Sequence, residues 1–398
     1  MSAVGVLIVG AGLGGLRTAQ GLRRNGYDGT IRLIGSEPHL PYDRPPLSKG
    51  VLVGDTSPES LRYVDTAELC KQEVDFLAGT TATCLHPRDR VVLLDSGQLC
   101  EYEHLVLATG AKARQPFSDA PAGVHTLRSL EDAVVISSQL SRAQRLVVIG
   151  AGFIGLEVAS SARVRGVKVT LLEAAPRALG RSLDERSAAA ITSLATDAGV
   201  DVRFGQTVSG FSGDKAVDGV VLAGGNVVPA DLVVVGVGAA PEASWLVGSG
   251  VPLLNGAVIC EASGRVQDTD RVWAVGDVAA WPDTGGAVRR REHWTAAVDQ
   301  ANVVAQNIAD GGQRVLDGPD YVWSEQFGHK ISIVGQVAQW DDMRVLDGRA
   351  STLAVLYAAR GRLVGACVVG QMPLVLKCRR SIAASAPIDE LELWQNAA

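Results

Sequence analysis

The chain has 398 residues, and its 47% hydrophobic, 20% charged and 5% aromatic content is typical of a globular protein and excludes disordered, collagen-like and coiled-coil chains. Its length predicts two or three domains, and its 45 glycines predict many tight turns and close backbone approaches. A formal net charge of −6 argues against nucleic-acid binding, because a phosphate backbone requires a broad basic surface.

Neither the cysteines nor the apolar runs indicate a metal centre or a membrane anchor. The six cysteines are scattered, without Cys-x-x-Cys or another metal-ligand spacing. The longest run without Asp, Glu, Lys or Arg, residues 243–260, contains Pro252 and several serines and glycines, which suit a membrane span poorly. Because the first glycine loop begins at Gly10, a cleavable secretory segment is not expected. We therefore expect a cytoplasmic protein with reduced thiols, as a monomer or a weak homodimer.

The N-terminal segment predicts a nucleotide-binding βαβ unit. An apolar run from residue 5 leads into a G-x-G-x-x-G loop, a helical pattern that ends at Asn25-Gly26, and a second strand at residues 31–34. Such glycines let the backbone approach a pyrophosphate, and the helix N-terminus supplies N–H groups to it. A carboxylate just beyond the second strand suits ribose hydroxyls. The residues expected to bind this nucleotide are Gly10, Gly12, Leu13, Gly15 and Glu37.

Four landmarks separate or follow the nucleotide-binding segments. Residues 40–49 are proline-rich, so they form neither a regular helix nor a central strand. Three apolar segments that end in small residues predict buried strands. A helix is expected after the third. These segments are residues 104–110, 231–241 and 271–277.

A second copy of the βαβ pattern begins at residue 146. Its glycine loop lies 140 residues after the first, and its acid, Glu173 at the end of a strand over residues 167–172, lies 136 residues after Glu37. A carboxylate there pairs with a free 2′-hydroxyl and repels a 2′-phosphate, so NADH is favoured over NADPH. We interpret Arg177 as a solvated surface residue. The residues expected to bind this second nucleotide are Gly150, Gly152, Phe153, Ile154, Gly155, Glu173 and Gly238.

The last part of the chain has a different pattern. Residues 331–337, 352–357 and 363–370 alternate like antiparallel strands, and a helix is expected after Pro373. This segment predicts a small α+β domain appended to the two nucleotide-binding domains.

The dipeptide Gly276-Asp277 indicates which nucleotide binds where. A carboxylate after a buried strand can hold a hydroxyl of an extended flavin, and here the chain resembles the flavoprotein pyridine-nucleotide reductases related to glutathione reductase. Residues 108–110 (A-T-G) and 235–241 (V-G-V-G-A-A-P) match connecting motifs of that family. The resemblance implies FAD in the first unit and NAD(P)H in the second, where Glu173 favours NADH. Because no two cysteines are close in sequence, disulfide-reductase chemistry is not expected.

A narrower resemblance follows from residues 41–49, P-Y-D-R-P-P-L-S-K. This segment resembles the ferredoxin reductases of bacterial cytochrome P450 and ring-hydroxylating dioxygenase systems. Residues 128–132 (R-S-L-E-D) and 323–326 (W-S-E-Q, with glutamate where the family has aspartate) also resemble that family, as do residues 291–301 with approximate spacing. The resemblance spans nearly the whole chain.

The resemblance implies an α/β fold with two Rossmann-like domains, which bind FAD and NAD, and a small C-terminal α+β domain. The expected boundaries are residues 1–112 and 246–320 for the FAD domain, 113–245 for the NAD domain and 321–398 for the C-terminal domain. The implied function is hydride transfer from NADH to FAD, then release of electrons one at a time to an external [2Fe–2S] ferredoxin. That ferredoxin would serve a cytochrome P450 or a ring-hydroxylating oxygenase.

Site roles also come from the resemblance. Lys49 is expected beside the flavin, where its ammonium stabilises negative charge on the reduced ring. Glu157 is expected to pair with Lys49 near the nicotinamide, and Trp323 to pack at the flavin on the electron exit. His293 is expected to be structural. The remaining FAD contacts implied are Arg44, Ala82, Ala108, Thr109, Gly110, Arg128, Asp277 and Trp294.

Other functions stay open at this point. Within the family they are an NADH oxidase, a rubredoxin reductase or a nitrite-reductase flavin subunit, and outside enzymes a redox sensor of the apoptosis-inducing-factor type. Because small ferredoxins are usually acidic, a reductase is expected to have a local basic dock. The two candidate clusters are Arg289, Arg290 and Arg291, and Lys377, Arg379 and Arg380.

Overall fold

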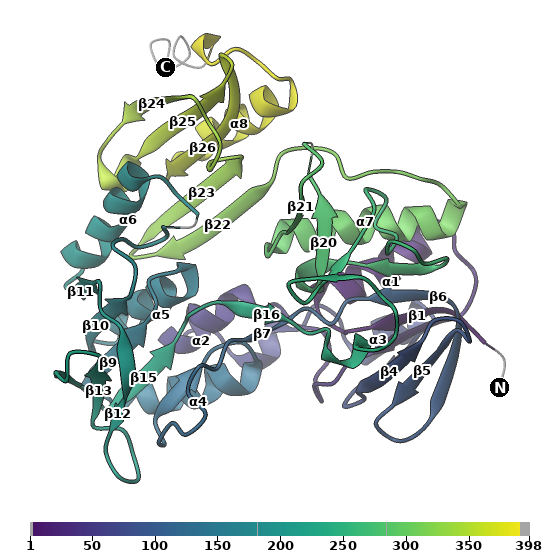
Figure 1. Cartoon of the computed structure of the whole chain (residues 1–398), viewed down its shortest axis with the longest axis horizontal. Helices are drawn as coiled ribbons and strands as arrows, with labels where there is room; N and C mark the ends of the chain where they lie inside the picture. The colour runs from purple at the N-terminus through teal and green to yellow at the C-terminus, as the bar shows by residue number, and fades with distance from the viewer. Residues whose placement is uncertain (1–2, 181, 284, 391–398) are drawn as a thin grey trace. The chain divides into compact units, whose positions relative to one another are not determined.

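The computed structural model describes residues 3–180, 182–283 and 285–390, and the chain divides into two compact units (Figure 1). Unit 1 comprises residues 1–43, 61–112 and 239–317. Unit 2 comprises residues 44–60, 113–238 and 318–398. The grouping differs from the expected boundaries, since residues 44–60 lie in the unit of residues 113–238, and residues 239–245 lie in the unit of residues 1–43. No helix in the described part of the chain is long and apolar enough to cross a membrane.

Unit 1 is built on a mostly parallel sheet in the order β3-β2-β1-β6-β5-β4, with β19 paired to β6. Strand β1 lies between β2 and β6 and is parallel to both. Its side chains, such as Leu7 and Ile8, are fully buried, as expected for a central parallel strand. The strands of this sheet are β1 (Val4–Val9), β2 (Ile31–Ile34), β3 (Val74–Leu77), β4 (Ala82–His86), β5 (Val91–Leu94), β6 (Leu99–Leu107) and β19 (Val272–Ala274).

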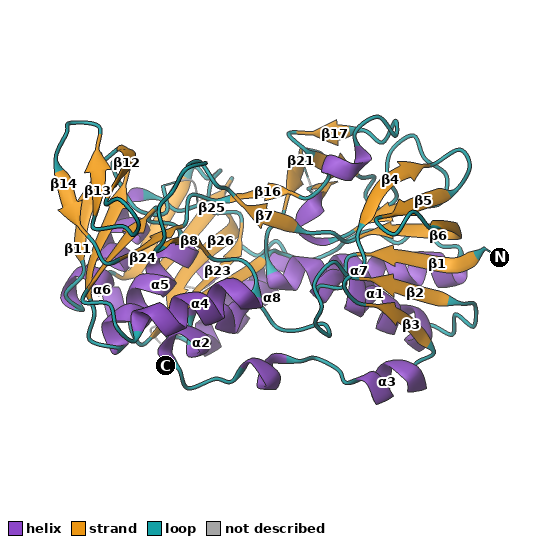
Figure 2. Ribbon diagram, turned by 90° about the horizontal axis from the view of Figure 1, so that it is seen from below, coloured by secondary structure: helices purple, strands orange, loops and turns teal. Residues whose placement is uncertain are grey.

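Helices α1 and α7 lie side by side along this sheet (Figure 2). Gly21 on α1 permits the close approach, because a Cβ there would lie 2.7 Å from the Cβ of Ala305 on α7. Helix α1 ends at Asn25, as the sequence predicts.

The helices of unit 1 are α1 (Leu13–Arg24), α3 (Thr66–Lys71) and α7 (Trp294–Asp310). Its other strands are β7 (Ala111–Ala113), which ends at the boundary with unit 2, β16 (Ala239–Pro241), β17 (Leu253–Leu254), β18 (Ala257–Ile259), β20 (Ala279–Pro282) and β21 (Val288–Arg290).

Two sequence expectations are wrong in detail. Gly276-Asp277 leads into a 3₁₀ turn (Gly276–Val278) and then β20, not into a helix. The reason is that the residues after the turn are apolar, and Trp281 is fully buried in the sheet formed by β17, β18, β20 and β21. The predicted strand over residues 231–241 is also broken, because Gly238 adopts a φ of +105° and β16 joins a different sheet.

The nucleotide-binding part of unit 2 repeats this architecture. Its parallel sheet has the order β11-β10-β9-β15-β8, and an antiparallel sheet β12-β13-β14 packs beside it. The strands are β8 (Val124–Thr126), β9 (Arg145–Ile149), β10 (Lys168–Glu173), β11 (Asp201–Phe204), β12 (Val208–Ser212), β13 (Gly219–Leu222), β14 (Val227–Pro229) and β15 (Leu232–Val235). The helices are α2 (Gly50–Val53), α4 (Leu130–Leu140), α5 (Phe153–Val164) and α6 (Glu185–Asp197), and Pro45–Ser48 and Pro58–Leu61 form 3₁₀ turns.

The C-terminal segment is an α+β element, as the sequence predicts. Its antiparallel sheet has the order β22-β23-β26-β25-β24, and helix α8 packs on it with Leu374, Val375 and Cys378 in the core. The elements are β22 (Tyr321–Gln326), β23 (His329–Gly335), β24 (Asp342–Asp347), β25 (Ala354–Ala359), β26 (Arg362–Val369) and α8 (Met372–Ala383).

A buried hydrogen-bond cluster joins α6 to the C-terminal sheet. Asp184 caps α6 by accepting backbone N–H bonds from Arg186 and Ser187, and it also accepts from the hydroxyl of Tyr357 on β25. The Tyr357 hydroxyl lies 2.8 Å from the Ser187 hydroxyl. Burial alone would raise the pKa of Asp184, but the bonds from Ser187, Tyr357 and Arg186 lower it below its ordinary value. The ionised carboxylate is therefore favoured in the folded chain.

This cluster predicts a pH-dependent loss of stability in Asp184→Asn. Asparagine caps a helix as well as aspartate, so the substitution mainly removes the charge that Tyr357 contacts. We expect about 1 kcal/mol of lost stability at pH 7. Since a lowered pKa stabilises the fold above the ordinary aspartate range near pH 4, the difference from wild type should shrink as the pH falls below it. Thermal unfolding midpoints at several pH values measure this, and a constant difference would contradict it.

Candidate nucleotide-binding and redox site

The first glycine loop follows β1 and has three glycines with three different functions. Gly10 has a φ of +115°, and a Cβ there would collide with the backbone of Ala108 at the end of β6. A Cβ on Gly15 would collide with the carbonyl oxygen of Gly10. A Cβ on Gly12 would meet nothing within 4 Å, so the loop leaves open space in front of this residue. That open space fits a pyrophosphate, which needs close approach to the backbone.

The start of α1 adds electrostatic support for an anion. Its N-cap, Gly12, contributes no side-chain capping bond, so the N–H groups of the first turn remain available to a ligand. Leu13 is the first helical residue and is half-buried. Glu37 lies beyond the end of β2 and accepts a hydrogen bond from the hydroxyl of Tyr42 (2.5 Å). Tyr42 belongs to the proline-rich motif, and the sequence alone did not indicate this contact.

The carboxyl ends of β1, β6 and β19 bring the other unit 1 candidates to the same edge of the sheet. A Cβ on Gly14 would lie 3.2 Å from Val275, which directly precedes Gly276-Asp277. The backbone N–H of Gly276 donates to Gln300 Oε1 (2.8 Å), and Gln300 is fully buried. In this sheet β2 and β3 lie on one side of β1, and β6 lies on its other side, so the strand order switches between β1 and β6. Ligands of open parallel sheets usually bind at such a switch point. Ala108, Thr109 and Gly110 follow β6 at this same edge.

Three further unit 1 candidates have defined contacts. Thr109 donates its hydroxyl to the carbonyl of Glu242 (2.6 Å). Trp294, the first residue of α7, donates its indole N–H to Tyr63 (2.9 Å) and to Asp43 (3.1 Å). Ala82 begins β4 and is buried. Burial, together with its bond to Asp43, raises the pKa of the Tyr63 phenol, so this residue acts as a neutral donor and acceptor.

The second glycine loop, in unit 2, has the same construction as the first. Gly150 has a φ of +104° and closely approaches the backbone of Gly236 after β15, Gly155 packs on the carbonyl of Gly150, and Gly152 faces open space. The N-cap of α5, Gly152, likewise contributes no side-chain cap. Phe153 and Ile154 form the first turn of α5, and Ile154 is an exposed apolar residue.

Glu173 ends β10 beside this loop. Its two carboxylate oxygens accept backbone N–H bonds from Ala151 and Ala175, both at 2.8 Å. These bonds fix the carboxylate at the loop. Arg177 donates to the carbonyls of Gly180 and Leu183, so its guanidinium is held by its own loop. The carbonyl of Gly238 accepts from the N–H of Arg114 (2.9 Å).

The predicted pair of Lys49 and Glu157 is present in unit 2. The Lys49 ammonium lies 2.9 Å from Glu157 Oε2, and Glu157 is only 4% exposed. Two hydroxyls that sequence reasoning missed also donate to this carboxylate: Ser48 at 2.5 Å and Ser324 at 2.6 Å. Lys49 additionally donates to the carbonyl of Pro45 (3.0 Å). A buried carboxylate requires hydrogen-bond donors, so the burial of Glu157 is the feature that would have indicated these two hydroxyls.

Two expected FAD contacts, Arg44 and Arg128, lie in unit 2 and contact one another. Arg44 donates to the carbonyl of Arg128 (2.7 Å). The R-S-L-E-D motif also has a structural explanation. Ser129 and Asp132 form a capping box at the start of α4, and the N–H of Arg128 donates to Asp132.

Trp323 on β22 lies within an aromatic and cationic cluster. Its ring stacks on Tyr321 with a centroid distance of 5.9 Å, and the Lys330 ammonium lies 5.9 Å from the Trp323 centroid. Arg379 of α8 lies over Tyr321 at 5.0 Å. The sequence did not assign Lys330 to either candidate basic cluster, because its position beside β22 follows only from the pairing of β22 with β23.

The two predicted basic clusters differ in their surroundings. Arg289 is paired with Asp283, and Arg290 with Glu292, within the chain. Arg291 is only 9% exposed. On α8, Arg379 and Arg380 are exposed and Lys377 is half-buried.

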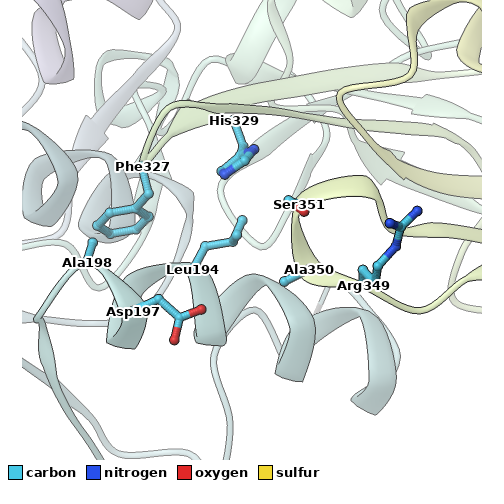
Figure 3. A pocket seen from close by; sticks show the side chains of 8 residues that line it. All are labelled: Leu194, Asp197, Ala198, Phe327, His329, Arg349, Ala350 and Ser351. Atoms are coloured by element: carbon cyan, nitrogen blue, oxygen red, sulfur yellow. The ribbon is translucent and has the colours of Figure 1, made fainter.

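A separate hollow of about 560 Å³ lies between α6 and the C-terminal sheet of unit 2 (Figure 3). It contains none of the predicted site residues. Its charged groups do not converge, since Arg349 pairs with Asp347. The residues that line it are Leu194, Asp197, Ala198, Phe327, His329, Arg349, Ala350 and Ser351.

Comparison with known proteins identifies the family of both segments. Residues 4–301 match the model described as pyridine nucleotide-disulphide oxidoreductase, and residues 321–398 match the reductase C-terminal model. The chain belongs to the pyridine nucleotide-disulphide oxidoreductase family. The C-terminal match begins at the residue where the sequence predicts the α+β domain.

Similar proteins within this family align over nearly the full chain. Rhodocoxin reductase of Rhodococcus erythropolis is 35% identical, covering 96% of this chain and 90% of its own. The ferredoxin–NAD(+) reductase component of the biphenyl dioxygenase system of Paraburkholderia xenovorans is 35% identical, covering 92% and 93%. The structure of a covalent putidaredoxin reductase–putidaredoxin complex superposes with a TM-score of 0.92 at 32% identity, covering 98% and 96%.

This member of the family has no paired cysteines in the described part of the chain, which includes all six. Burial raises the pKa of the Cys367 and Cys378 thiols to about 12, and it also raises the pKa of Cys260. Thiols with such values are not nucleophilic at neutral pH.

The glycine geometry predicts that one of two neighbouring substitutions weakens nucleotide binding and that the other lowers stability. Gly152→Ala places a methyl group in the open space, so we expect at least tenfold weaker pyridine-nucleotide binding with an unchanged unfolding midpoint. Gly155→Ala forces its Cβ onto the Gly150 carbonyl, so we expect a lower unfolding midpoint. Titration calorimetry with NAD⁺ and thermal unfolding measure the two effects. Gly210→Ala, on a strand with open space around it, is the matched control, and equal behaviour of all three variants would contradict the assignment.

Proposed function

We propose that this chain is an NADH-dependent ferredoxin reductase, which oxidises NADH and passes electrons singly to a [2Fe–2S] ferredoxin of a cytochrome P450 or ring-hydroxylating oxygenase system. The observation that carries the proposal is the pair of glycine loops with the same construction, each at the edge of its own parallel sheet. Two such loops in one chain suit two dinucleotides between which electrons pass. The names of the relatives, aligned over at least nine-tenths of the chain, support a ferredoxin as the acceptor.

We assign FAD to unit 1. Its pyrophosphate would be held at Gly12 and the N-terminus of α1, and its hydroxyls by Glu37 and Asp277. The proposed contacts of Ala82, Ala108–Gly110 and Trp294, which lie in this unit, follow from the resemblance. When bound, FAD accepts a hydride and releases electrons one at a time.

We assign NADH to unit 2. Gly152 and the N-terminus of α5 would hold its pyrophosphate, and Glu173 its adenosine ribose. Because the Glu173 carboxylate is fixed by two backbone bonds, a 2′-phosphate would meet a negative charge that cannot easily turn away. NADH is therefore the expected donor in preference to NADPH.

Lys49 and Glu157 are the proposed catalytic pair. The Lys49 ammonium is oriented by Glu157 and by the Pro45 carbonyl, and it is 21% exposed, so part of it remains available to a ligand. A fixed cation placed before the reaction stabilises negative charge as that charge develops. Glu157, which is only 4% exposed, keeps the cation in position.

The proposed ferredoxin-docking surface consists of Tyr321, Trp323, Lys330, Arg379 and Arg380. Aromatic rings supply an apolar centre, and the cations that lie on or beside them supply complementarity to an acidic partner. We place the dock at α8 and β22 because Arg379 and Arg380 are exposed there, whereas Arg289 and Arg290 are paired with Asp283 and Glu292. Lys330 is itself paired with Glu325 at 3.8 Å, so the two arginines contribute most of the available charge.

We also propose a cytoplasmic location, which the six unpaired cysteines favour. A monomer or a weak homodimer remains the proposed oligomeric state.

The function is tested with purified protein. We expect one FAD per chain, bleaching of its colour by NADH, and NADH-driven cytochrome c reduction that depends on added [2Fe–2S] ferredoxin. Ferricyanide reduction without ferredoxin is the positive control for hydride transfer. A colourless protein that cannot be reconstituted with FAD would overturn the proposal. Full turnover with oxygen alone would identify an NADH oxidase instead, and flavin reduction without turnover on any acceptor would identify a redox sensor.

Charge reversal tests the docking surface. Arg380→Glu should raise the KM for ferredoxin about tenfold at low ionic strength, because it replaces attraction with repulsion, and the difference should shrink with added salt. Flavin reduction by NADH should not change. Arg142→Glu, an exposed arginine after α4, is the matched control. An unchanged ferredoxin KM and salt dependence for Arg380→Glu would refute the dock while leaving the reductase proposal intact.

A further inference from the structure

The buried carboxylate of Glu157 divides its two oxygens between two parts of the chain. Oε2 accepts from Ser48 and pairs with Lys49, which both belong to the segment of residues 44–60. Oε1 accepts from the hydroxyl of Ser324 on β22, at 2.6 Å. Within the described part of the chain, Ser324 is the one hydrogen-bond donor to Oε1. The orientation of the carboxylate therefore depends on β22 as well as on the lysine segment.

Gln326 supplies a second hydrogen bond to the Ser324 hydroxyl. Its Nε2 donates to Ser324 Oγ at 3.1 Å. An amide nitrogen only donates and an ionised carboxylate only accepts, so the single Ser324 proton points to Glu157. Ser324 and Gln326 are 1% and 2% exposed, so water does not compete freely for these bonds. The three residues form one directed chain from Gln326 through Ser324 to Glu157.

The alternation of β22 explains why these residues act together. Ser324 and Gln326 are two residues apart and share one face of the strand, whereas Trp323 and Glu325 share the other. The residue that follows β22 also binds α5. The N–H of Phe327 donates to the Oγ of Ser160 (2.7 Å), which lies about one helical turn after Glu157. The two contacts fix β22 against the helix that carries Glu157.

We propose that Ser324 is a positioning residue for the reaction with NADH. It holds Glu157 Oε1, Gln326 donates to its hydroxyl oxygen, and Glu157 in turn holds the Lys49 ammonium. This inference rests on the proposed function, in which Lys49 and Glu157 act on the reacting nucleotide. Without the Ser324 hydroxyl, one buried carboxylate oxygen has no donor, so the carboxylate turns and Lys49 loses its fixed orientation.

The first test separates rate from affinity. In stopped-flow experiments on the FAD-loaded protein, Ser324→Ala should lower the limiting rate of flavin reduction by NADH about tenfold, the scale of one hydrogen bond to a charged group. The apparent dissociation constant of NADH should not change. Ser324→Thr, which keeps the hydroxyl, should restore most of the rate. Ser332→Ala is the matched control, because Ser332 is also 1% exposed and lies on the neighbouring strand β23.

The second test does not depend on turnover. Thermal unfolding midpoints are compared for Ser324→Ala, Glu157→Gln and the double variant. If Ser324 acts through Glu157, the double variant should lose less than the sum of the two single losses, because the contact is already absent in each. Additive losses would overturn the inference.

The outcomes distinguish the two levels of proposal. If Glu157→Gln reduces flavin as fast as wild type, the proposed function of the Lys49–Glu157 pair fails. If Glu157→Gln is slow but Ser324→Ala matches Ser332→Ala, the positioning function of Ser324 is refuted and the reductase proposal stands. A fall in NADH affinity without a fall in the limiting rate would also refute positioning, since it would assign Ser324 to binding.

Discussion

A carboxylate that is 4% exposed cannot be left without partners, and this constraint at Glu157 organises unit 2. Its partners come from two segments that are distant in sequence, residues 44–60 and β22. Removal of one partner from such a buried ion pair typically costs several kcal/mol, because the other charge remains buried. The requirement contributes to the grouping of Lys49 and Ser48 with the second glycine loop, although these residues precede it by about a hundred positions, and hydrogen bonds from Ser137, Ser161 and Arg165 hold the same segment.

The paired glycine loops impose the second constraint. In both loops a left-handed glycine lets the chain turn against the end of a neighbouring strand, and the third glycine lets the helix pack on the turn. These are packing requirements that hold without any ligand. The middle glycines, Gly12 and Gly152, have no such packing reason, because no atom in the described part of the chain would lie within 4 Å of a Cβ at either position. The open space beside these two glycines can accept a pyrophosphate, and it is the feature of the loops that indicates nucleotide binding.

Periodicity and glycine spacing predicted much of the fold, because local signals determine it. The bounds of α1 and β2 and the appended C-terminal sheet follow from such signals. The turn after Asp277 was misread, because the burial of Trp281 in a second sheet is a tertiary effect. The Lys49–Glu157 pair was predicted through resemblance, but Ser48 and Ser324 were not, because serine hydroxyls have no sequence signature until the carboxylate they contact is seen to be buried.

Strand β22 shows how one short motif serves two purposes. A β-strand presents alternate residues to opposite faces, so the four residues of W-S-E-Q divide into two pairs. Trp323 and Glu325 lie on the face where Lys330 contributes its charge, and Ser324 and Gln326 lie on the buried face against α5. A one-residue shift of register would exchange the two faces and would both bury the tryptophan and expose the serine. The spacing of the motif is therefore a consequence of the strand geometry. Through it, β22 contributes Trp323 to the surface proposed for the partner and Ser324 to the carboxylate proposed for the reaction.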